Sequence, residues 1–289
     1  MPNRPSSQAA FGGLHLIHRH IVHPTDLTAV GAAAHRHALA LALAARAQLT
    51  LLHVEPGTGT ADFDAFPLVR PELIRWGRLQ EGASQAEVLG LGLSVKKLQV
   101  VADEPARGVV DYLATHPADI VVLATHRREG LSGWLRRSVA EPIARGVSAP
   151  TLCVPEGVSG FIEETSGTVR MQRVLLPVSH SDRAQLAADS LARLGDWLTC
   201  NRLAVQTLHI DGSHMPPTYR PPERTGWTCT STHRCGDVVA EILRAAKDHQ
   251  ADLVVMVTEG RVSWSDTFSG STTEQVLRQA PCPVLILPA

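Results

Sequence analysis

The sequence has almost no net charge and no long apolar run. Its 289 residues carry a formal net charge of −1, so the overall electrostatics do not predict binding to nucleic acid or to an anionic membrane. No apolar run approaches the ~18 residues that a membrane-spanning helix needs. With 44% apolar and 19% charged residues, the composition is that of a globular protein, long enough for about two domains of ordinary size.

Cysteine is scarce, and a secretory signal is not evident. The chain has five cysteines, which do not make the disulfide framework of a small secreted protein, and an odd number suits a reducing compartment. The first residues, MPNRPSSQAAFGG, lack the long apolar segment of a signal peptide. We therefore expect a cytoplasmic protein.

The usual signatures of nucleotide-dependent enzymes are missing. ATHRREG (124–130) lacks the lysine and the spacing of a Walker A loop. No G-x-G-x-x-G follows a strand-like run, which disfavours a Rossmann dehydrogenase. Asp26 has no second carboxylate or histidine placed beside it by the sequence, and it fits equally a residue that caps the next helix. The sequence therefore predicts no catalytic residue.

What the sequence does contain is an internal repeat. Strand-like and helix-like segments alternate from HIVHPTDLT (20–28) to APTLCVP (149–155), and the pattern restarts at RVLLPVSHS (173–181). The unit of roughly 130 residues is too long for a solenoid. Strands that alternate with helices of this size predict a parallel sheet covered by helices on both faces.

The repeat divides the chain into two domains. We place domain 1 at residues 14–156, a linker rich in Gly, Ser and Glu at 157–170, and domain 2 at 171–289. In the second copy GSHMPPTYRPPERT (212–225) stands where the first copy has a helical segment. Its prolines cannot continue a helix, so we expect domain 2 to be shorter by one covering helix.

Several short motifs recur at corresponding places of the two copies. They are the P-T-D type strand end, the LLHV second strand, the AD[IL]VV fourth strand, and the SVAE and APCPVL endings. Together they make residues 20–288 resemble the universal stress protein family in its tandem form. The resemblance implies an α/β fold of two tandem flavodoxin-like (adenine nucleotide alpha hydrolase-like) domains, each an open five-stranded parallel sheet. Many members bind ATP or AMP at the carboxyl ends of the strands, and others bind none.

The nucleotide-binding members share a phosphate loop that resembles G-x2-G-x9-G-[ST]. Glycines allow the backbone to approach the phosphates, and the following helix offers amide groups at its N-terminus. In the first copy the three glycine positions hold Ala124, Arg127 and Arg137, and Ser138 follows. The arginines could reach a phosphate by charge, fill the cavity or pair with a carboxylate. The positions that correspond to nucleoside contacts in this copy are Asp26 and Val54.

The second copy keeps more of this loop. Its glycine positions hold Val257, Gly260 and Gly270, with nine residues between the two glycines. The aspartate position holds Ser179, which removes a charge-assisted hydrogen bond of about 1.5–3 kcal/mol. The same stretch also fits a serine-capped helix after a loop. The positions that the resemblance assigns to a nucleotide in this copy are Pro177, Ser179, Ile210, Gly260, Gly270, Ser271 and Thr272.

These observations predict a stress-response regulatory protein that binds an adenine nucleotide, ATP or AMP, in domain 2 without clear catalysis. Mg²⁺ is an optional companion, and no cofactor is required. The first copy, degenerate at its phosphate loop, is expected to serve packing and dimerisation. The alternatives are an interaction module that binds no nucleotide, a weak ATPase and a metal-binding protein.

A metal site would need the segment C-x3-H-x-C, formed by Cys229, His233 and Cys235. On a strand these three side chains share one face. Structural zinc sites, however, usually contain paired C-x2-4-C, so no metal site is predicted.

Self-association is predicted from the last strand of each copy. TLCVP (151–155) and VLILP (284–288) each end a unit at a sheet edge, and exposed apolar edges favour pairing. In the family this edge joins separate chains. We expect the two edges of this chain to pair with each other, antiparallel.

Overall fold

The computed structural model describes residues 19–57, 61–63, 68–125, 140–211, 217–258 and 271–289. Within these residues strands and helices alternate along the chain, as the repeat predicts. The strands are β1 (His20–Pro24), β2 (Gln48–Glu55), β3 (Ser94–Val101), β4 (Ile120–Thr125), β5 (Thr151–Pro155), β6 (Arg173–Pro177), β7 (Leu203–Asp211), β8 (Trp227–Cys235), β9 (Leu253–Thr258) and β10 (Val284–Pro288). The helices are η1 (Ala29–Gly31), α1 (Ala32–Ala45), α2 (Val69–Arg75), α3 (Gln85–Gly90), α4 (Pro105–Thr115), α5 (Ala140–Gly146), α6 (Ser181–Trp197), α7 (Val238–Asp248) and α8 (Thr272–Gln279).

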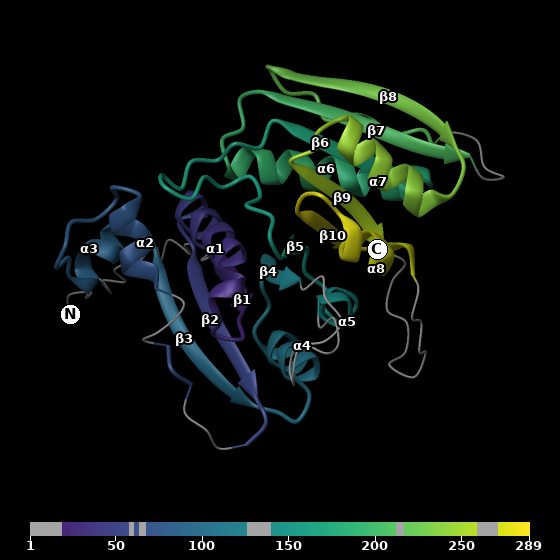
Figure 1. Ribbon diagram of the computed structural model, residues 1–289. Helices are drawn as coiled ribbons and strands as arrows, with labels where there is room; N and C mark the ends of the chain where they lie inside the picture. Colours follow the sequence, from purple (N-terminus) through teal and green to yellow (C-terminus); the bar gives the residue numbers. More distant parts are fainter. Residues whose placement is uncertain (1–18, 58–60, 64–67, 126–139, 212–216, 259–270) are drawn as a thin grey trace, which may run out of the picture.

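All ten strands form one sheet, with the order β3-β2-β1-β4-β5-β10-β9-β6-β7-β8. Read from its outer strand inward, each half has the same order, so the predicted flavodoxin-like fold occurs twice. Every pairing is parallel except that of β5 with β10, where Leu285 lies opposite Leu152 in an antiparallel register. The two halves thus meet at a central seam, and β3 and β8 lie at the far ends of the sheet (Figure 1).

The inner strands form because they are apolar over their whole length. β4 and β9 are buried at nearly every residue, as expected for parallel strands covered on both faces. Helices α1 and α6 pack on one face of the sheet, and α4, α5, α7 and α8 cover the other. Each face carries one buried apolar cluster with members from both halves. The two halves therefore share their core.

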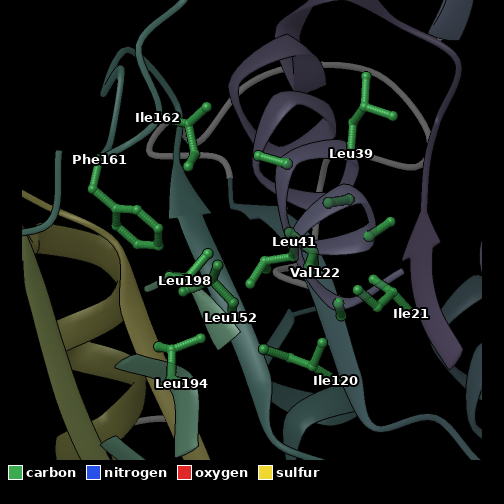
Figure 2. Packing of buried hydrophobic residues seen from close by; sticks show 14 of the residues in the cluster. Ile21, Leu39, Leu41, Ile120, Val122, Leu152, Phe161, Ile162, Leu194 and Leu198 are labelled. Carbon is green, nitrogen blue, oxygen red and sulfur yellow. The ribbon is translucent and has the colours of Figure 1, made fainter. Parts of the chain in front are cut away.

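The segment between the halves is packed, although its composition is that of a linker. Phe161 and Ile162 are each 2% exposed and belong to the cluster under α1 and α6, which Figure 2 shows together with Leu152 of β5 and Leu194 of α6. The Phe161 amide donates to Nε2 of His37 at 3.1 Å. These contacts fix the linker against α1.

A glycine is required just before this contact. Gly160 has a φ of +72°, and a Cβ atom at this position would lie 2.2 Å from Cε1 of His37. Because the ring of His37 is buried, it has no room to move away. The indole of Trp76 donates to the carbonyl of Glu164 at 3.0 Å, which adds a second attachment of the linker to the first half.

The second half has an extended proline-rich segment where the first half has α2 and α3. The amides of Thr218 and Arg220 donate to Ser181 and Gln185 on α6 at 2.9 and 3.0 Å. Within the described residues of this segment, 217–226, no helix is present. The α6 face of β7 and β8 is therefore covered by less structure than the corresponding face of β2 and β3.

No helix in the part of the chain that the structure describes is long and apolar enough to span a membrane.

Candidate functional site

The carboxyl ends of β6 and β9 form the candidate site in the second half. β6 pairs with β7 on one side and with β9 on the other, so the chain connections leave this point in opposite directions. Open parallel sheets bind ligands at such a point, outside the carboxyl ends of the strands. The corresponding point of the first half lies between β1 and β4.

The N-terminus of α8 lies on this side of the sheet, because α8 connects the parallel strands β9 and β10. Ser271 is the N-cap, and its hydroxyl accepts a hydrogen bond from the Glu274 amide at 3.1 Å. The amides of a first helical turn have no acceptor within the helix, so those of Thr272 and Thr273 are suited to an anion. Glu274 opposes an anion by its charge, but Arg278 forms an ion pair with it. Gly260 and Gly270 lie outside the described residues.

The residues assigned to the nucleoside lie at the ends of β6 and β7. Pro177 is the last residue of β6 and is half-buried, whereas Ser179 is exposed. The Ser179 hydroxyl contacts Nδ1 of His180 at 3.0 Å. Ile210 is half-buried and packs against the apolar layer on the α7 side. The structure thus places these three residues at the same edge as Ser271.

A histidine that sequence reasoning missed lies at this edge in both halves. Nδ1 of His209 contacts the carbonyl oxygen of Val178 at 3.3 Å, and in the first half Nδ1 of His53 contacts the carbonyl oxygen of Thr25 at 2.8 Å. Because a carbonyl can only accept, each Nδ1 carries the proton. Each histidine therefore holds the loop that follows the first strand of its half. The recurrence of His in LLHV and TLHI was the available signal.

In the first half, the described residues at the nucleotide positions, Asp26 and Val54, make contacts within the protein. Oδ1 of Asp26 accepts hydrogen bonds from the amide and the hydroxyl of Thr28, at 3.0 and 2.9 Å. This contact forms the turn before η1. Val54 is fully buried, and its side chain lies so close to Gly108 that an added Cβ there would meet it at 2.5 Å. Arg127, Arg137 and Ser138 lie outside the described residues.

Two further histidines, His23 and His35, are buried between β1 and α1, with ring centroids 5.8 Å apart. Burial lowers the pKa of His23 to about 4, although its Nδ1 contacts the carbonyl of Val122 at 2.9 Å. Burial also lowers the pKa of His35 well below its ordinary value. At neutral pH both are neutral, and neither reaches solvent to act as an acid or a base.

The fold and the placement of these residues agree with a comparison against known families. The model of the universal stress protein family matches residues 18–155 and 223–288, more than half of the chain. The chain belongs to the universal stress protein family. The residues between the two matched segments, 156–222, hold the packed linker, β6, α6, β7 and the start of the proline-rich segment.

Solved structures that share the fold cover almost the whole chain at low identity. A universal stress protein from Archaeoglobus fulgidus is 16% identical, covers 93% of this chain and 98% of its own, and has a TM-score of 0.57. A functionally unknown protein from Pseudomonas aeruginosa is 14% identical, covers 93% of this chain and 92% of its own, and has a TM-score of 0.60. At such identities these similarities show the tandem fold alone.

A curated relative matches over a short stretch. It is a universal stress protein encoded in the QAH/OAS sulfhydrylase 3′ region of Thermus aquaticus, 46% identical over 46 residues. The match spans 16% of this chain and about a third, 34%, of that relative.

In this family member the C-x3-H-x-C segment lies on the outer strand β8. Cys229, His233 and Cys235 occupy alternate positions of the strand and are all exposed. The ring of His233 stacks on that of His209, with centroids 5.3 Å apart, and the Cys229 thiol lies 3.7 Å from the Pro222 carbonyl. Among the residues that the structure describes, no three His, Cys, Asp or Glu side chains form a group that could hold a metal ion.

Proposed function

We propose that this universal stress protein is a cytoplasmic stress-response regulator that binds an adenine nucleotide, ATP or AMP, in its second half and does not turn it over. The observation that carries the proposal is the position of β9 and α8 at the edge where β6 and β9 meet. The chain leaves the sheet at Thr258 and re-enters a helix at Ser271, so the segment with the two glycines begins and ends where an open sheet takes its ligand.

Among the described residues at this edge, the backbone amides at the start of α8 support phosphate binding. Ser271 caps α8 by accepting the Glu274 amide, and the amides of Thr272 and Thr273 at this helix end have no acceptor within the helix. The exposed Ser179 stands at the nucleoside position. Because a serine cannot supply the charge-assisted hydrogen bond of an aspartate, we expect weaker binding than in a member with the complete motif.

Nucleotide binding is expected to raise the melting temperature. At a ligand concentration of 100 times Kd, binding to the folded state alone adds about 2.7 kcal/mol to the free energy of unfolding. The measurement is a thermal melt with ATP, ADP and AMP, each with and without Mg²⁺. Gly270→Val should remove the shift, because the branched side chain keeps a phosphate away from the backbone.

Gly90→Val is the matched control, since an added Cβ at Gly90 has no atom within 4 Å and α3 belongs to the first half. It should retain the nucleotide shift. If ATP, ADP and AMP leave the wild-type melting temperature unchanged, the protein is an interaction module and the proposal is wrong. Release of inorganic phosphate above background would show that the nucleotide is hydrolysed.

A pair of helix-cap variants separates stability from binding. Ser271 caps α8, and Asp237 caps α7 through a 2.8 Å hydrogen bond from the Ala240 amide. Replacing either cap by alanine should lower the free energy of unfolding by about 1 kcal/mol. Only Ser271→Ala should also weaken nucleotide binding, measured by titration calorimetry. Equal affinities in the two variants would assign to Ser271 a purely structural role.

A further inference from the structure

The ten-stranded sheet has two open edges, and they are β3 and β8. In the family, the last strand of the sheet joins separate chains. In this chain the last strand of each half is already paired and has no edge left for another chain. β5 and β10 pair with each other inside this chain. Association of this protein through its sheet therefore has to use one of the two outer strands.

The edge at β3 carries features that prevent strand pairing. Lys96 and Lys97 stand in the middle of the strand and are exposed, and lysines on an edge strand discourage pairing. Nζ of Lys97 donates to the carbonyl of Phe63 at 2.8 Å, and Oε1 of Gln99 accepts from the Ala61 amide at 2.9 Å. Residues 61–63 thus lie beside this strand.

The edge at β8 lacks the lysines of β3, although the proline-rich segment reaches it at Cys229, whose thiol lies 3.7 Å from the Pro222 carbonyl. Its nine residues, WTCTSTHRC, include no lysine, proline or carboxylate. Arg234 is turned toward α7, where it forms ion pairs with Asp248 at 2.7 Å and with Glu241 at 3.5 Å. Most of the strand is exposed, and it includes both of the chain's exposed cysteines, Cys229 and Cys235. Threonine, which occurs three times in this strand, favours strand pairing.

We propose that β8 is a docking edge for a second copy of this chain, paired antiparallel about a two-fold axis at Thr232. In this register Cys229 lies opposite Cys235 of the second copy, and Ser231 lies opposite His233 of the second copy. Arg234 meets a threonine, so no like charges face each other. A two-fold axis makes the contacts reciprocal. This register places both exposed cysteines of each copy directly opposite a cysteine.

The two cysteines provide a test that reads the register. A disulfide forms across the strands when diamide takes up the two electrons and two protons that the paired thiols release. In a Cys200→Ser background, which removes the remaining half-buried thiol, we expect a covalent dimer on a non-reducing gel. Cys229→Ser alone and Cys235→Ser alone should give no dimer, because each leaves its thiol opposite a serine. An equimolar mixture of the two variants should give the dimer again.

Both cysteines are exposed, so neither serine variant disturbs the core. Dimers in either single variant would show a different register or random collision, and would overturn the proposal. No dimer in the mixture would overturn it as well. The mixture depends on β8 alone, so these outcomes are independent of nucleotide binding.

Sedimentation equilibrium tests the same edge without oxidation. A nine-residue strand pair buries less surface than a standard interface, so we expect a weak dimer that becomes visible at about 1 mM protein. Thr232→Lys places two ammonium groups at the axis and should weaken the dimer at least about tenfold. Ser94→Lys on β3 is the matched control and should leave it unchanged. A wild-type protein that is monomeric at about 1 mM, or equal effects of the two variants, would contradict the proposal.

Discussion

Lowering the pH from 7 to 5 is expected to reduce the free energy of unfolding by about 4 kcal/mol through the buried His23 and His37 alone, because both resist protonation. His35, whose pKa burial also lowers, acts in the same direction. Burial lowers the pKa of His23 and of His37 to about 4, whereas an unfolded histidine titrates near 6.5. Between these values the unfolded chain binds more protons than the folded chain. The stabilisation is complete above pH 6.5 and is lost as the pH falls toward 4, at about 2 kcal/mol for each histidine by pH 5.

The contacts of His37 explain why its ring must remain neutral. Nε2 accepts a hydrogen bond from the Phe161 amide, so it carries no proton, and Nδ1 donates to the Ala33 carbonyl at 2.7 Å. A second proton on the ring would sit on Nε2 and would point at the N–H group of Phe161. The hydrogen bond would then break, and the linker would detach from α1. Acid should therefore weaken the joint between the two halves.

The measurement is urea unfolding at pH 7 and at pH 5. In His37→Gln the difference between the two pH values should shrink by about 2 kcal/mol, although the variant is less stable at both. His116→Gln is the control. That imidazole is exposed in the folded chain, so the difference should stay as in the wild type. An unchanged difference in His37→Gln would show that this buried ring does not govern the acid sensitivity.

The sequence predicts the strands because local patterns determine them. The apolar runs that became β4 and β9 are too uniform for an exposed strand, and their recurrence predicts two halves of the same fold. The tandem fold follows from the repeat and from the family motifs.

Local sequence patterns could not predict the contacts between residues that are far apart in the sequence. The linker was expected from its Gly, Ser and Glu content, but its packing depends on His37 and Phe161, which are 124 residues apart. At the site, Ser271 could be identified as a helix cap from its place before Thr272, whereas the role of His209 depends on the carbonyl of Val178, in the loop that follows β6. An isolated histidine carries no sign of such a partner.

Phe161→Ala is expected to cost about 4 kcal/mol of stability, because a buried phenylalanine leaves a cavity when it is truncated. The side chain is 2% exposed, and its ring meets that of His37 edge-on with centroids 4.5 Å apart. Phe63→Ala is the matched control at a half-buried position and should cost about 1 to 2 kcal/mol.

The way in which this stability is lost tests whether the two halves are one folding unit. Phe161 belongs to an apolar cluster that includes Leu41 of α1 and Leu285 of β10, and β5 and β10 join the halves into a single sheet. A shared core predicts one cooperative transition. Calorimetry should therefore give equal calorimetric and van't Hoff enthalpies in the wild type, and Phe161→Ala should shift the whole transition. Two transitions, one of them at the wild-type temperature, would show that the halves unfold independently and that the linker serves only to connect them.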